Sequence, residues 1–477
     1  MFDFFHCYYR LPRDISNRLD VLYNDTMFDT VEESIRRSPY EFIPLGEVAT
    51  LKRESRNPQE TPDEEFFYVD IGSINTAKGQ AEPIRMKGVD AKSSRMHRVI
   101  TKNQVLVSTT RPTRNAICIV PEELDDQICS TGFAVLETKP DMLPRFLFHS
   151  LRCNLSTLQF ERHCSGSGYP AINQETDLPK IRIPKPDTEV QSRIVDRLVS
   201  LGIEADQLEL QANQMREAAS GTLIAELGFK QPEETRYFFK SGAENQSMAF
   251  YEFASDISDR LHFLFYHPKH IYLGELGKKY KTTLLESACR EPIHRGEQVK
   301  EDENGTQILL KTVNLKNDHI DFDNATAIST ETFKSNPSAK ARNGDILLAS
   351  TGYVSMGKVD IYDRELPSLV DGHISIIRLN DDYDAHFVAY FLRSHFGRLQ
   401  MDKWWTGSSG QIELPQANIA KFIIISCQSL PQKQQSQIAE RITRELSKAR
   451  ELDAKARIKR DESKQVFEQL VLGRIMP

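Results

Sequence analysis

The chain has 477 residues, of which 39% are apolar and 27% are charged, and its formal net charge is −7. This length predicts two or more domains, and no run of residues approaches the roughly 20 apolar positions that a membrane-spanning helix needs. Seven Cys without a C-x-x-C pair predict neither a disulfide framework nor a structural zinc site, and the lack of a signal-peptide pattern agrees with a cytoplasmic location.

The predicted elements occur twice, in the same order and about 240 residues apart. In the first half, a turn at residue 103 leads into a strand that is apolar on both faces, and residues 146–152 form a short amphipathic helix. A Gly/Ser loop at 165–168, a strand at 180–183 and a long helix that begins near Gln191 follow. The matched segments are 16–19 with 258–261, 45–48 with 273–276, 103–110 with 344–351, 146–152 with 387–393, 165–168 with 406–410, 180–183 with 421–424, and 191–195 with 435–439.

Seven matches in one order indicate a duplication, so we predict an α/β fold of mixed α+β type with two similar globules that each end in a long helix. The polar segment 228–246, which contains a Pro and a Glu pair, is the predicted linker. The predicted ranges are 1–187 and 247–431 for the globules and 188–227 and 432–477 for the helices.

The first long helix, over residues 187–226, has apolar residues at alternating spacings of four and three. That is the heptad pattern of a helix packed along a partner helix. The second, from about 432 to 472, is less regular. We predict helix pairing through Ile194, Leu198, Leu201, Leu208, Met215, Ile438, Ile442 and Leu452.

The two helices differ in charge, because residues 188–226 include 3 basic and 7 acidic residues and residues 432–472 include 10 basic and 7 acidic ones. Complementary flanks favour an antiparallel coiled coil of the two helices over self-pairing. The alternatives are that each helix pairs with another subunit, or that the first lies only on its own domain. Two globules held at a fixed distance would suit a DNA duplex, whose turn repeats every 34–36 Å or so.

Basic residues gather between residues 85 and 114, where eight Lys or Arg accompany one acid, Asp90. This surplus predicts phosphate contacts, although a solvated basic face has the same pattern. The Gly/Ser loops allow close approach of a phosphate backbone, the alternative being ordinary flexible loops, and the Trp pair beside the second loop would contact DNA or fill the core. The predicted DNA-binding residues are Arg95, Arg98, Lys102, Arg111, Arg114, Ser165, Ser167, Tyr169, Tyr353, Ser355, Lys358, Lys403, Trp404, Ser408, Ser409 and Gln411.

Three stretches carry a resemblance to a known family: the globule start at 45–48 with its copy at 273, the strand and turn at 345–359, and the run at 181–186 that leads into 191–195. With these residues the chain resembles the specificity subunit of Type I restriction–modification enzymes, usually called HsdS. The resemblance covers nearly the whole chain, and the ordered duplication is its most specific part.

The resemblance implies two target recognition domains, each reading one half of a bipartite, asymmetric DNA site. It also implies that the two long antiparallel coiled-coil helices set the spacer and dock two methyltransferase subunits, and that restriction and translocase subunits join the complex. No cofactor is expected in this chain, because S-adenosylmethionine, ATP and Mg²⁺ would belong to the partner subunits.

The second copy departs from the first, reading Ile-Ile-Ile-Ser-Cys where the first reads Ile-Arg-Ile-Pro-Lys, and Gly352 stands where the first half has Arg111. This divergence predicts that the two globules read different half-sites.

No catalytic residue and no metal site are predicted. Residues 352–358 are spaced like a P-loop, but no Ser or Thr follows Lys358 and a strand is predicted where a P-loop needs a helix. Acids such as Asp321 and Asp323 would suit a nuclease but are typical of solvated turns. We therefore predict a non-catalytic DNA-specificity subunit for methylation and restriction in phage defence. The alternatives are a coiled-coil scaffold that does not bind DNA, a DNA reader of another defence system, and a stand-alone nuclease.

Overall fold

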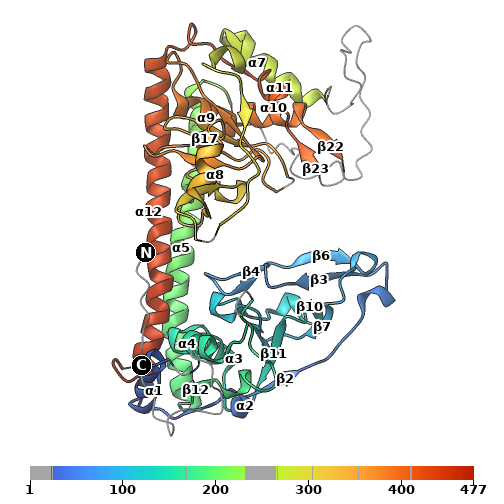
Figure 1. The fold of residues 1–477 in the computed structure, drawn as a ribbon, viewed down its shortest axis with the longest axis vertical. Coiled ribbons are helices and arrows are strands. Elements are labelled where there is room, and N and C mark those ends of the chain that lie inside the picture. Colours follow the sequence, from blue (N-terminus) through green and yellow to red (C-terminus); the bar gives the residue numbers. More distant parts are fainter. Residues whose placement is uncertain are drawn as a thin grey trace. The chain divides into compact units, whose positions relative to one another are not determined.

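A computed structural model describes residues 23, 25–166, 169–230, 265, 267–302, 304–352, 354–408 and 411–476 (Figure 1). The matched segments 16–19 and 258–261 and most of the predicted linker lie outside the described residues. The chain forms two compact units, Met1–Leu210 with Leu452–Pro477 (unit 1) and Gln211–Glu451 (unit 2). Each unit therefore contains part of both long helices, whereas the predicted domains treat each helix as a segment of its own.

Unit 1 contains two four-stranded sheets. The first has the order β2-β11-β8-β9, made of Ala49–Lys52, Phe133–Thr138, Val105–Ser108 and Ile117–Ile119. The second has the order β6-β3-β10-β7, made of Ile84–Lys87, Glu65–Val69, Gln127–Ser130 and Met96–Ile100, and its β3–β10 pair is parallel. Two short antiparallel pairs are β1 (Phe42–Pro44) with β12 (Arg182–Pro184) and β4 (Ile74–Asn75) with β5 (Gln80–Ala81).

The helices of unit 1 cover the first sheet. They are α1 (Met27–Arg36), α2 (Leu45–Val48), α3 (Pro144–Arg152), α4 (Asn154–His163) and the start of α5 (Thr188–Glu226), with 3-10 turns at Pro58–Glu60, Gly88–Asp90, Pro112–Arg114, Glu122–Leu124 and Leu178–Lys180. Strand β8 is buried on both faces: Val105 and Val107 belong to the core shared with these helices, and Leu106 belongs to a second core. The prediction of a doubly buried strand at this place is confirmed.

Unit 2 repeats this plan. Its first sheet has the order β14-β21-β18-β19, made of His294–Arg295, Ile374–Ile377, Ile346–Ala349 and Val359–Ile361. Its second has the order β16-β15-β20-β17, made of Thr326–Ile328, Gln307–Leu310, Ser368–Val370 and Lys340–Ala341, again with one parallel pair, β15–β20. The short pairs are β13 (Thr282–Leu284) with β24 (Ile423–Ile425) and β22 (Thr406–Ser408) with β23 (Gln411–Glu413).

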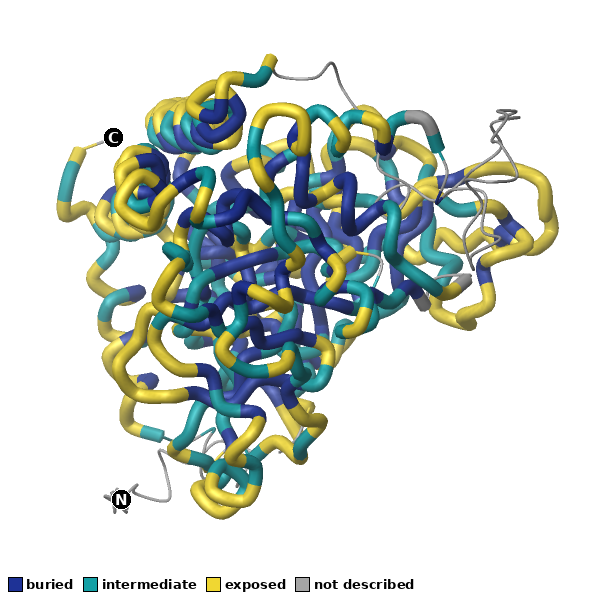
Figure 2. Tube along the Cα trace, turned by 90° about the horizontal axis from the view of Figure 1, so that it is seen from above, coloured by how far each residue is buried: buried dark blue, intermediate teal, exposed yellow. Residues whose placement is uncertain are grey.

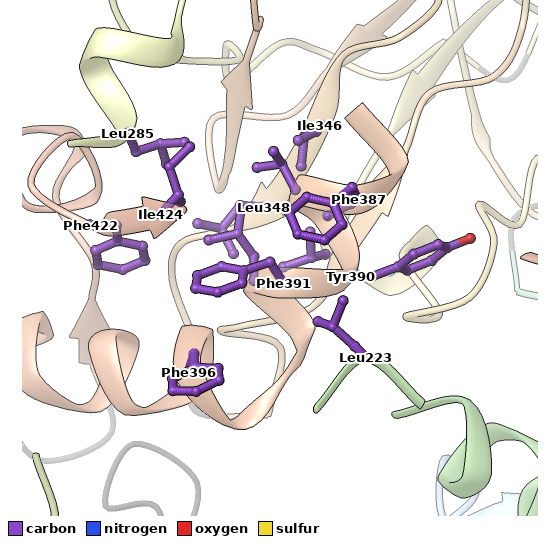
Figure 3. Close-up of a cluster of buried hydrophobic side chains, with 14 of the residues drawn as sticks. Leu223, Leu285, Ile346, Leu348, Phe387, Tyr390, Phe391, Phe396, Phe422 and Ile424 are labelled. Atoms are coloured by element: carbon purple, nitrogen blue, oxygen red, sulfur yellow. The ribbon is translucent and has the colours of Figure 1, made fainter. Parts of the chain in front are cut away.

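The helices of unit 2 are α7 (Tyr272–Lys279), α8 (Thr330–Ser335), α9 (Ala385–Arg393), α10 (His395–Trp404), α11 (Gln416–Ile419) and the start of α12 (Gln432–Val471), with 3-10 turns at Pro268–Ile271, Leu285–Ala288 and Thr312–Asn314. Figure 3 shows side chains of its largest core, where Phe387, Tyr390 and Phe391 of α9 gather with Leu348 of β18 and Leu223 of α5. Buried residues, dark blue in Figure 2, cluster along neighbouring segments, and exposed residues occupy the outer loops.

The strand orders of the two units correspond strand for strand, so the predicted duplication is present in the fold as well as in the sequence. The duplication extends to two buried Gln side chains that make equivalent hydrogen bonds in the two units. The Gln191 Oε1 atom accepts a hydrogen bond from the backbone N–H of Leu143 before α3, at 2.8 Å, and Gln435 Oε1 accepts one from Asp384 before α9, at 3.0 Å. Both side chains are fully buried.

One predicted match is wrong. Residues 273–276 lie inside α7, and the segment equivalent to α2 is Leu285–Ala288. The hydrogen bonds decide this, because Leu45 N–H donates to Ile181 O at 2.8 Å and Leu285 N–H donates to Phe422 O at 2.7 Å. The spacing between 45 and 285 also agrees with the other matches, whereas the shared letters Leu-Gly-Glu at 273 do not.

The two long helices pair in opposite directions within each unit. In unit 1 the start of α5, with Ile194 and Leu198, shares a core with Phe467 and Leu470 near the end of α12. In unit 2 the end of α5, with Leu223, shares a core with the start of α12. Ion pairs join the acidic and basic flanks, as the charge contrast predicts: Arg460 with Asp206 and Glu209, Lys459 with Glu204, and Arg441 with Glu226.

The buried line of this coiled coil is made largely of alanine. Ala205, Ala212, Ala219, Ala449 and Ala456 are almost completely buried, as are Ile194, Leu198, Ile438 and Ile442 of the predicted pairing residues. The other four, Leu201, Leu208, Met215 and Leu452, are only half-buried. Small side chains let the two backbones approach closely, which moves the larger residues to the margin of the interface.

Within the described residues, no helix is long and apolar enough to cross a membrane.

Candidate nucleic-acid interface

In unit 1 the Gly/Ser loop is hydrogen-bonded to the turn that follows β8. Ser165 and Ala171 exchange two backbone hydrogen bonds of 2.9 Å, Ile172 N–H donates to Thr109 O at 2.9 Å, and Arg111 N–H donates to Pro170 O at 2.7 Å. The loop thus closes as a hairpin beside the end of a buried strand. A rigid sheet therefore positions an exposed loop, as recognition loops require.

Arg111 and Tyr169 form the most prominent feature of this hairpin. The guanidinium carbon of Arg111 lies 4.5 Å from the centroid of the Tyr169 ring, and Tyr169 is 74% exposed. Arg111 also has a φ of +49°, a left-handed conformation that costs a non-glycine residue about 1–2 kcal/mol. In such a pair the guanidinium can donate hydrogen bonds to a phosphate or to a guanine, and the exposed aromatic ring can stack on a base.

Unit 2 presents the same construction with different side chains. Gly352, which takes the place of Arg111, also has a left-handed φ of +85°, and its N–H donates to Ile412 O at 3.1 Å. Leu414 N–H donates to Ser350 O at 2.8 Å, so the β22–β23 hairpin is anchored as the loop of unit 1 is. Both units therefore need a left-handed backbone conformation at this position, and unit 1 alone has an Arg side chain there.

A chain of hydrogen bonds links Arg95 to the Arg111 hairpin. Thr131 N–H donates to Arg95 O at 3.0 Å, and Gln174 Nε2 donates to Thr131 O at 3.2 Å and to Thr109 Oγ1 at 3.4 Å. Arg95, Arg114 and Ser165 are exposed. The structure therefore brings Arg95, Arg111, Arg114, Ser165 and Tyr169 to one end of strand β8.

The remaining basic candidates of unit 1 lie elsewhere. Lys102 precedes β8, at the opposite end of the strand from Arg111, and pairs with Glu122 at 2.7 Å. The half-buried Arg98 donates through Nη1 to Lys52 O at 2.9 Å, and Arg85 pairs with Glu65. Because the segment 85–114 runs through three strands of two sheets, its charges are distributed over several faces.

The candidates of unit 2 are also divided. Ser355 and Lys358 follow Gly352, but Lys358 is half-buried, its Nζ lies 3.5 Å from Thr312 O, and burial, followed by the nearby Lys316, lowers its pKa. Lys403 Nζ lies 4.5 Å from the centroid of the Phe265 ring. The Trp404 ring meets the same Phe265 edge-on at 5.0 Å and packs against the core, as Trp405 does.

The loop residues are only partly described. Ser408 and Gln411 lie opposite each other in the β22–β23 pair, and the positions of their side chains lie outside the described part of the chain. Ser167, Tyr353 and Ser409 lie outside the described residues altogether.

A polar cluster that the sequence does not predict lies beside the hairpin of unit 2. Thr351 Oγ1 lies 2.6 Å from His373 Nδ1, and Gln298 Nε2 lies 3.5 Å from His373 Nε2. Arg295 pairs with Glu413 of β23. His373 and Gln298 are exposed, and their donors and acceptors suit the edges of bases.

A signal for this cluster exists in the duplication. Arg53 directly follows β2 and pairs at 2.7 Å with Glu175, which follows the hairpin of unit 1, and Arg295 ends the equivalent strand β14. Aligning the edge strands of the two halves would therefore have placed Arg295 beside the second hairpin.

Within the described residues, neither loop has the geometry of a nucleotide-binding P-loop or of a metal site. Residues 352–358 lead into strand β19, as predicted, instead of the helix that a P-loop requires. Among the described residues, no three His, Cys, Asp or Glu side chains lie together as metal ligands would. The chemistry available at the loops is recognition through hydrogen bonds, charge and stacking.

Comparisons with known proteins give the following matches. Residues 37–215 match the family model of the Type I restriction modification DNA specificity domain. The specificity subunit of the Type I restriction enzyme HindI of Haemophilus influenzae is 28% identical over 173 residues, which cover 35% of this chain and 34% of that protein. The specificity subunit of the EcoDI enzyme of Escherichia coli is 27% identical over 174 residues, covering 36% of this chain and 37% of that protein. The chain thus aligns with about a third of the length of these relatives.

Matches to solved structures cover more of the chain. An HsdS subunit from Thermoanaerobacter tengcongensis is 22% identical, covers 91% of this chain and 97% of that one, and has a TM-score of 0.36. An S subunit of a Type I restriction–modification system from M. genitalium is 14% identical, covers 90% and 96%, and also has a TM-score of 0.36.

Proposed function

We propose that this chain, whose residues 37–215 belong to the Type I restriction modification DNA specificity family, is the subunit that reads DNA for a Type I restriction–modification complex. The family match supports the role of unit 1. The strand-for-strand repeat of unit 1 in unit 2 supports a second reader outside the matched segment. In this proposal each unit reads one half of a bipartite site on double-stranded DNA.

The observation that carries the proposal is the hairpin anchored to the turn after the central strand, which occurs in both units. Unit 1 equips it with Arg111 and Tyr169, whereas unit 2 has Gly352 there and places His373 and Gln298 nearby. Different side chains on the same backbone arrangement predict two different half-sites and therefore an asymmetric target.

The long helices would set the spacer between the half-sites and dock two methyltransferase subunits, which restriction and translocase subunits would join. The chain itself would be non-catalytic. S-adenosylmethionine, ATP and Mg²⁺ would act on those partner subunits, so the chemistry of methylation and cleavage lies outside this chain.

The proposal is tested by co-expressing the chain with the methyltransferase subunit of its operon and mapping methylated bases by sequencing. We expect methylation at one sequence with two different defined halves and an undefined spacer. Methylation that needs only one uninterrupted sequence would contradict the two-reader proposal. An assembly that forms but neither methylates nor binds DNA would favour the scaffold alternative.

A further inference from the structure

The second sheet of each unit meets the paired helices through a polar turn. Among the described residues, the cores in which the second sheets take part include no residue of α5 or α12. The first sheets, by contrast, share their cores with both helices. Apolar packing therefore holds each first sheet on the helices directly, whereas each second sheet contacts them through charged groups.

In unit 1 this turn joins β4 to β5. Ile74 and Ala81 at its ends pack in the core of the second sheet. Lys78 Nζ, near its tip, lies 2.6 Å from Glu209 Oε2 of α5, and Glu209 also pairs with Arg460 of α12. Burial raises the pKa of Glu209, but Lys78 and Arg460 outweigh it and hold the pKa below its usual value. A charged carboxylate therefore joins the turn to both helices.

The tip of this turn is held in place from the other side by Arg152. Its Nη2 donates to Thr76 O at 2.7 Å and to Ala77 O at 3.0 Å. Gly79 has a φ of +67°, and a Cβ atom there would overlap the guanidinium of Arg152. Because Arg152 ends α3, and α3 packs in the core shared with the helices, the turn has a fixed position beside α5.

Unit 2 has an equivalent turn over residues 315–320. Leu315 and Ile320 at its ends pack in the core of the second sheet of that unit. Asp318 at its tip pairs with Arg216 Nε of α5 at 2.9 Å, and His319 Nδ1 lies 2.6 Å from the other carboxylate oxygen of Asp318. The turn of unit 2 is thus also anchored in the sheet and joined to a helix by charge.

The two contacts use equivalent arginines in different ways. Arg216 and Arg460 are separated by the same number of residues as Gln191 and Gln435, which mark the starts of the two helices. Arg216 pairs with the turn directly, whereas Arg460 is joined to its turn through Glu209. The turn supplies a lysine in unit 1 and an aspartate in unit 2. A connection that is present in both units with different residues indicates that the connection itself is needed.

Burial separates these contacts from ordinary surface ion pairs. The side chains of Lys78 and Glu209 are 29% and 28% exposed, and that of Asp318 is 3% exposed. The surface pair of Lys102 and Glu122, in comparison, is 48% and 79% exposed. Water screens exposed pairs, which therefore contribute little, whereas partly buried pairs hold their partners in one geometry.

We propose that the two turns are latches that fix the angle of each globule on the paired helices and so restrict the complex to one spacer length. The positioning residues are Lys78 and Glu209 in unit 1 and Asp318 and Arg216 in unit 2. The inference rests on the proposed function, in which the helices set the distance between the half-sites. The latches add the direction in which each globule faces.

The geometry of DNA explains why this angle matters. One added base pair rotates a half-site by roughly 35° about the duplex axis, because a helical turn contains about 10–10.5 base pairs. A globule that is held at one angle does not follow this rotation. A globule whose latch is broken keeps its apolar attachment through the first sheet but can tilt, and it then accepts neighbouring spacers.

The test measures which spacers are methylated once the half-sites are mapped. The full chain is co-expressed with the methyltransferase subunit and a plasmid library in which the native spacer is shortened or lengthened by one or two base pairs. We expect Lys78→Gln and Arg216→Gln each to raise methylation at the neighbouring spacers, relative to the native spacer, by at least about threefold. The bases preferred in both half-sites should stay the same.

The matched control is Lys459→Gln, because Lys459 pairs at 3.2 Å with Glu204 and joins the helices to each other instead of to a globule. It should keep the spacer preference of the wild type, as should Lys78→Arg, which retains the charge. An unchanged preference in both Lys78→Gln and Arg216→Gln, or an equal relaxation in Lys459→Gln, would overturn the inference. Altered half-site bases would also overturn it, since the residues would then read DNA.

Hydrogen exchange tests the first latch without DNA. In the purified full chain, the peptide over residues 74–81 should exchange at least about threefold faster in Lys78→Gln than in the wild type, and at the wild-type rate in Lys459→Gln. Equal rates in all three proteins would overturn the latch even where a variant directs no methylation. Faster exchange in Lys78→Gln, with a wild-type complex that methylates no bipartite site, would overturn the proposed function and the role in the spacer while the latch itself stands.

Discussion

The side chain of Gln191 satisfies three backbone groups at one junction of unit 1. It is fully buried, accepts from Leu143 N–H, and donates through Nε2 to Asp141 O at 3.0 Å and Pro186 O at 2.9 Å. Three backbone groups at the junction of α3 and α5 therefore depend on it. Gln435 repeats two of these bonds at the equivalent junction of unit 2.

Replacing Gln191 with Ala should destabilise unit 1 by about 2–4 kcal/mol, because buried backbone groups lose their partners and a cavity remains. Urea denaturation of the full chain, followed by fluorescence and circular dichroism, measures this loss. Gln207→Ala, at an exposed position of the same helix, should change the stability by no more than about 0.5 kcal/mol. Equal effects of the two substitutions would contradict this account of Gln191.

Lys102 precedes strand β8 and Arg111 follows it, so substitutions of these two residues test which end of the strand contacts DNA. In the assembled complex, Arg111→Ala should weaken binding to the target duplex by about 1–3 kcal/mol and reduce its salt dependence if the contact is a phosphate. Lys102→Ala should have little effect, because Lys102 pairs with Glu122 at the opposite end of the strand. Fluorescence anisotropy at several salt concentrations measures the DNA affinity of both variants and its salt dependence. A larger loss of affinity for Lys102→Ala than for Arg111→Ala would contradict the placement of the DNA surface at the Arg111 end of β8.

The environment of His149 predicts that the stability of unit 1 depends on pH. Burial, followed by the charges of Arg152 and Arg145, lowers its pKa from 6.5 to about 3. Below pH 6.5, His149 is protonated in the unfolded chain and stays neutral in the folded chain. The free energy of unfolding is therefore highest above this pH and falls as the pH decreases. At pH 5 the cost is about 2 kcal/mol relative to pH 7.5. His149→Gln should lose this part of the dependence in urea denaturation at the two pH values, and an unchanged dependence would show that His149 takes up its proton in the folded state.

At the scale of elements, α5 and α12 show that the coiled coil is specified by small residues and by charge. Alanines occupy its buried line, and the acidic flank of α5 pairs with the basic flank of α12 in both units. Buried positions recur every seven residues in the middle of both helices, at 205, 212 and 219 of α5 and at 442, 449 and 456 of α12, so a whole heptad can be added there without changing which face is buried.

We expect that repeating residues 205–211 and 449–455 together lengthens both helices by one heptad, about 10.5 Å, and increases the DNA spacer by about 3 base pairs. The half-sites should stay the same. Sequencing of methylated sites measures the spacer. Repeating only one of the two segments should impair assembly, because the helices would no longer match, and an unchanged spacer in the double insertion would mean that the helices do not set it.

At the scale of the whole molecule, two copies of one plan differ in side chains at their exposed hairpins and agree in the strands and buried residues that form their cores. Strand order, the buried Gln residues and the hairpin anchors are shared, while Arg111 and Gly352 differ at one backbone position. Exchanging residues 45–186 for those of a relative with another target should therefore change one half-site and leave the other intact. Sequencing of methylated bases decides this, and a change in both half-sites would contradict independent reading by the two units.

The sequence by itself determined the duplication, the two long helices, their opposite charges and the family resemblance, which the match over residues 37–215 confirms. These features are periodic or local, so they can be read from residue spacing. Only the tertiary structure decided that Arg95 lies beside the Arg111 hairpin, that His373 and Gln298 gather beside the second hairpin, and that residues 285–288, and not 273–276, are equivalent to α2. Such relations depend on which strands pair across long stretches of chain, and strand pairing is set by the packing of both halves of each core. The DNA-binding role of the individual candidates stays a prediction.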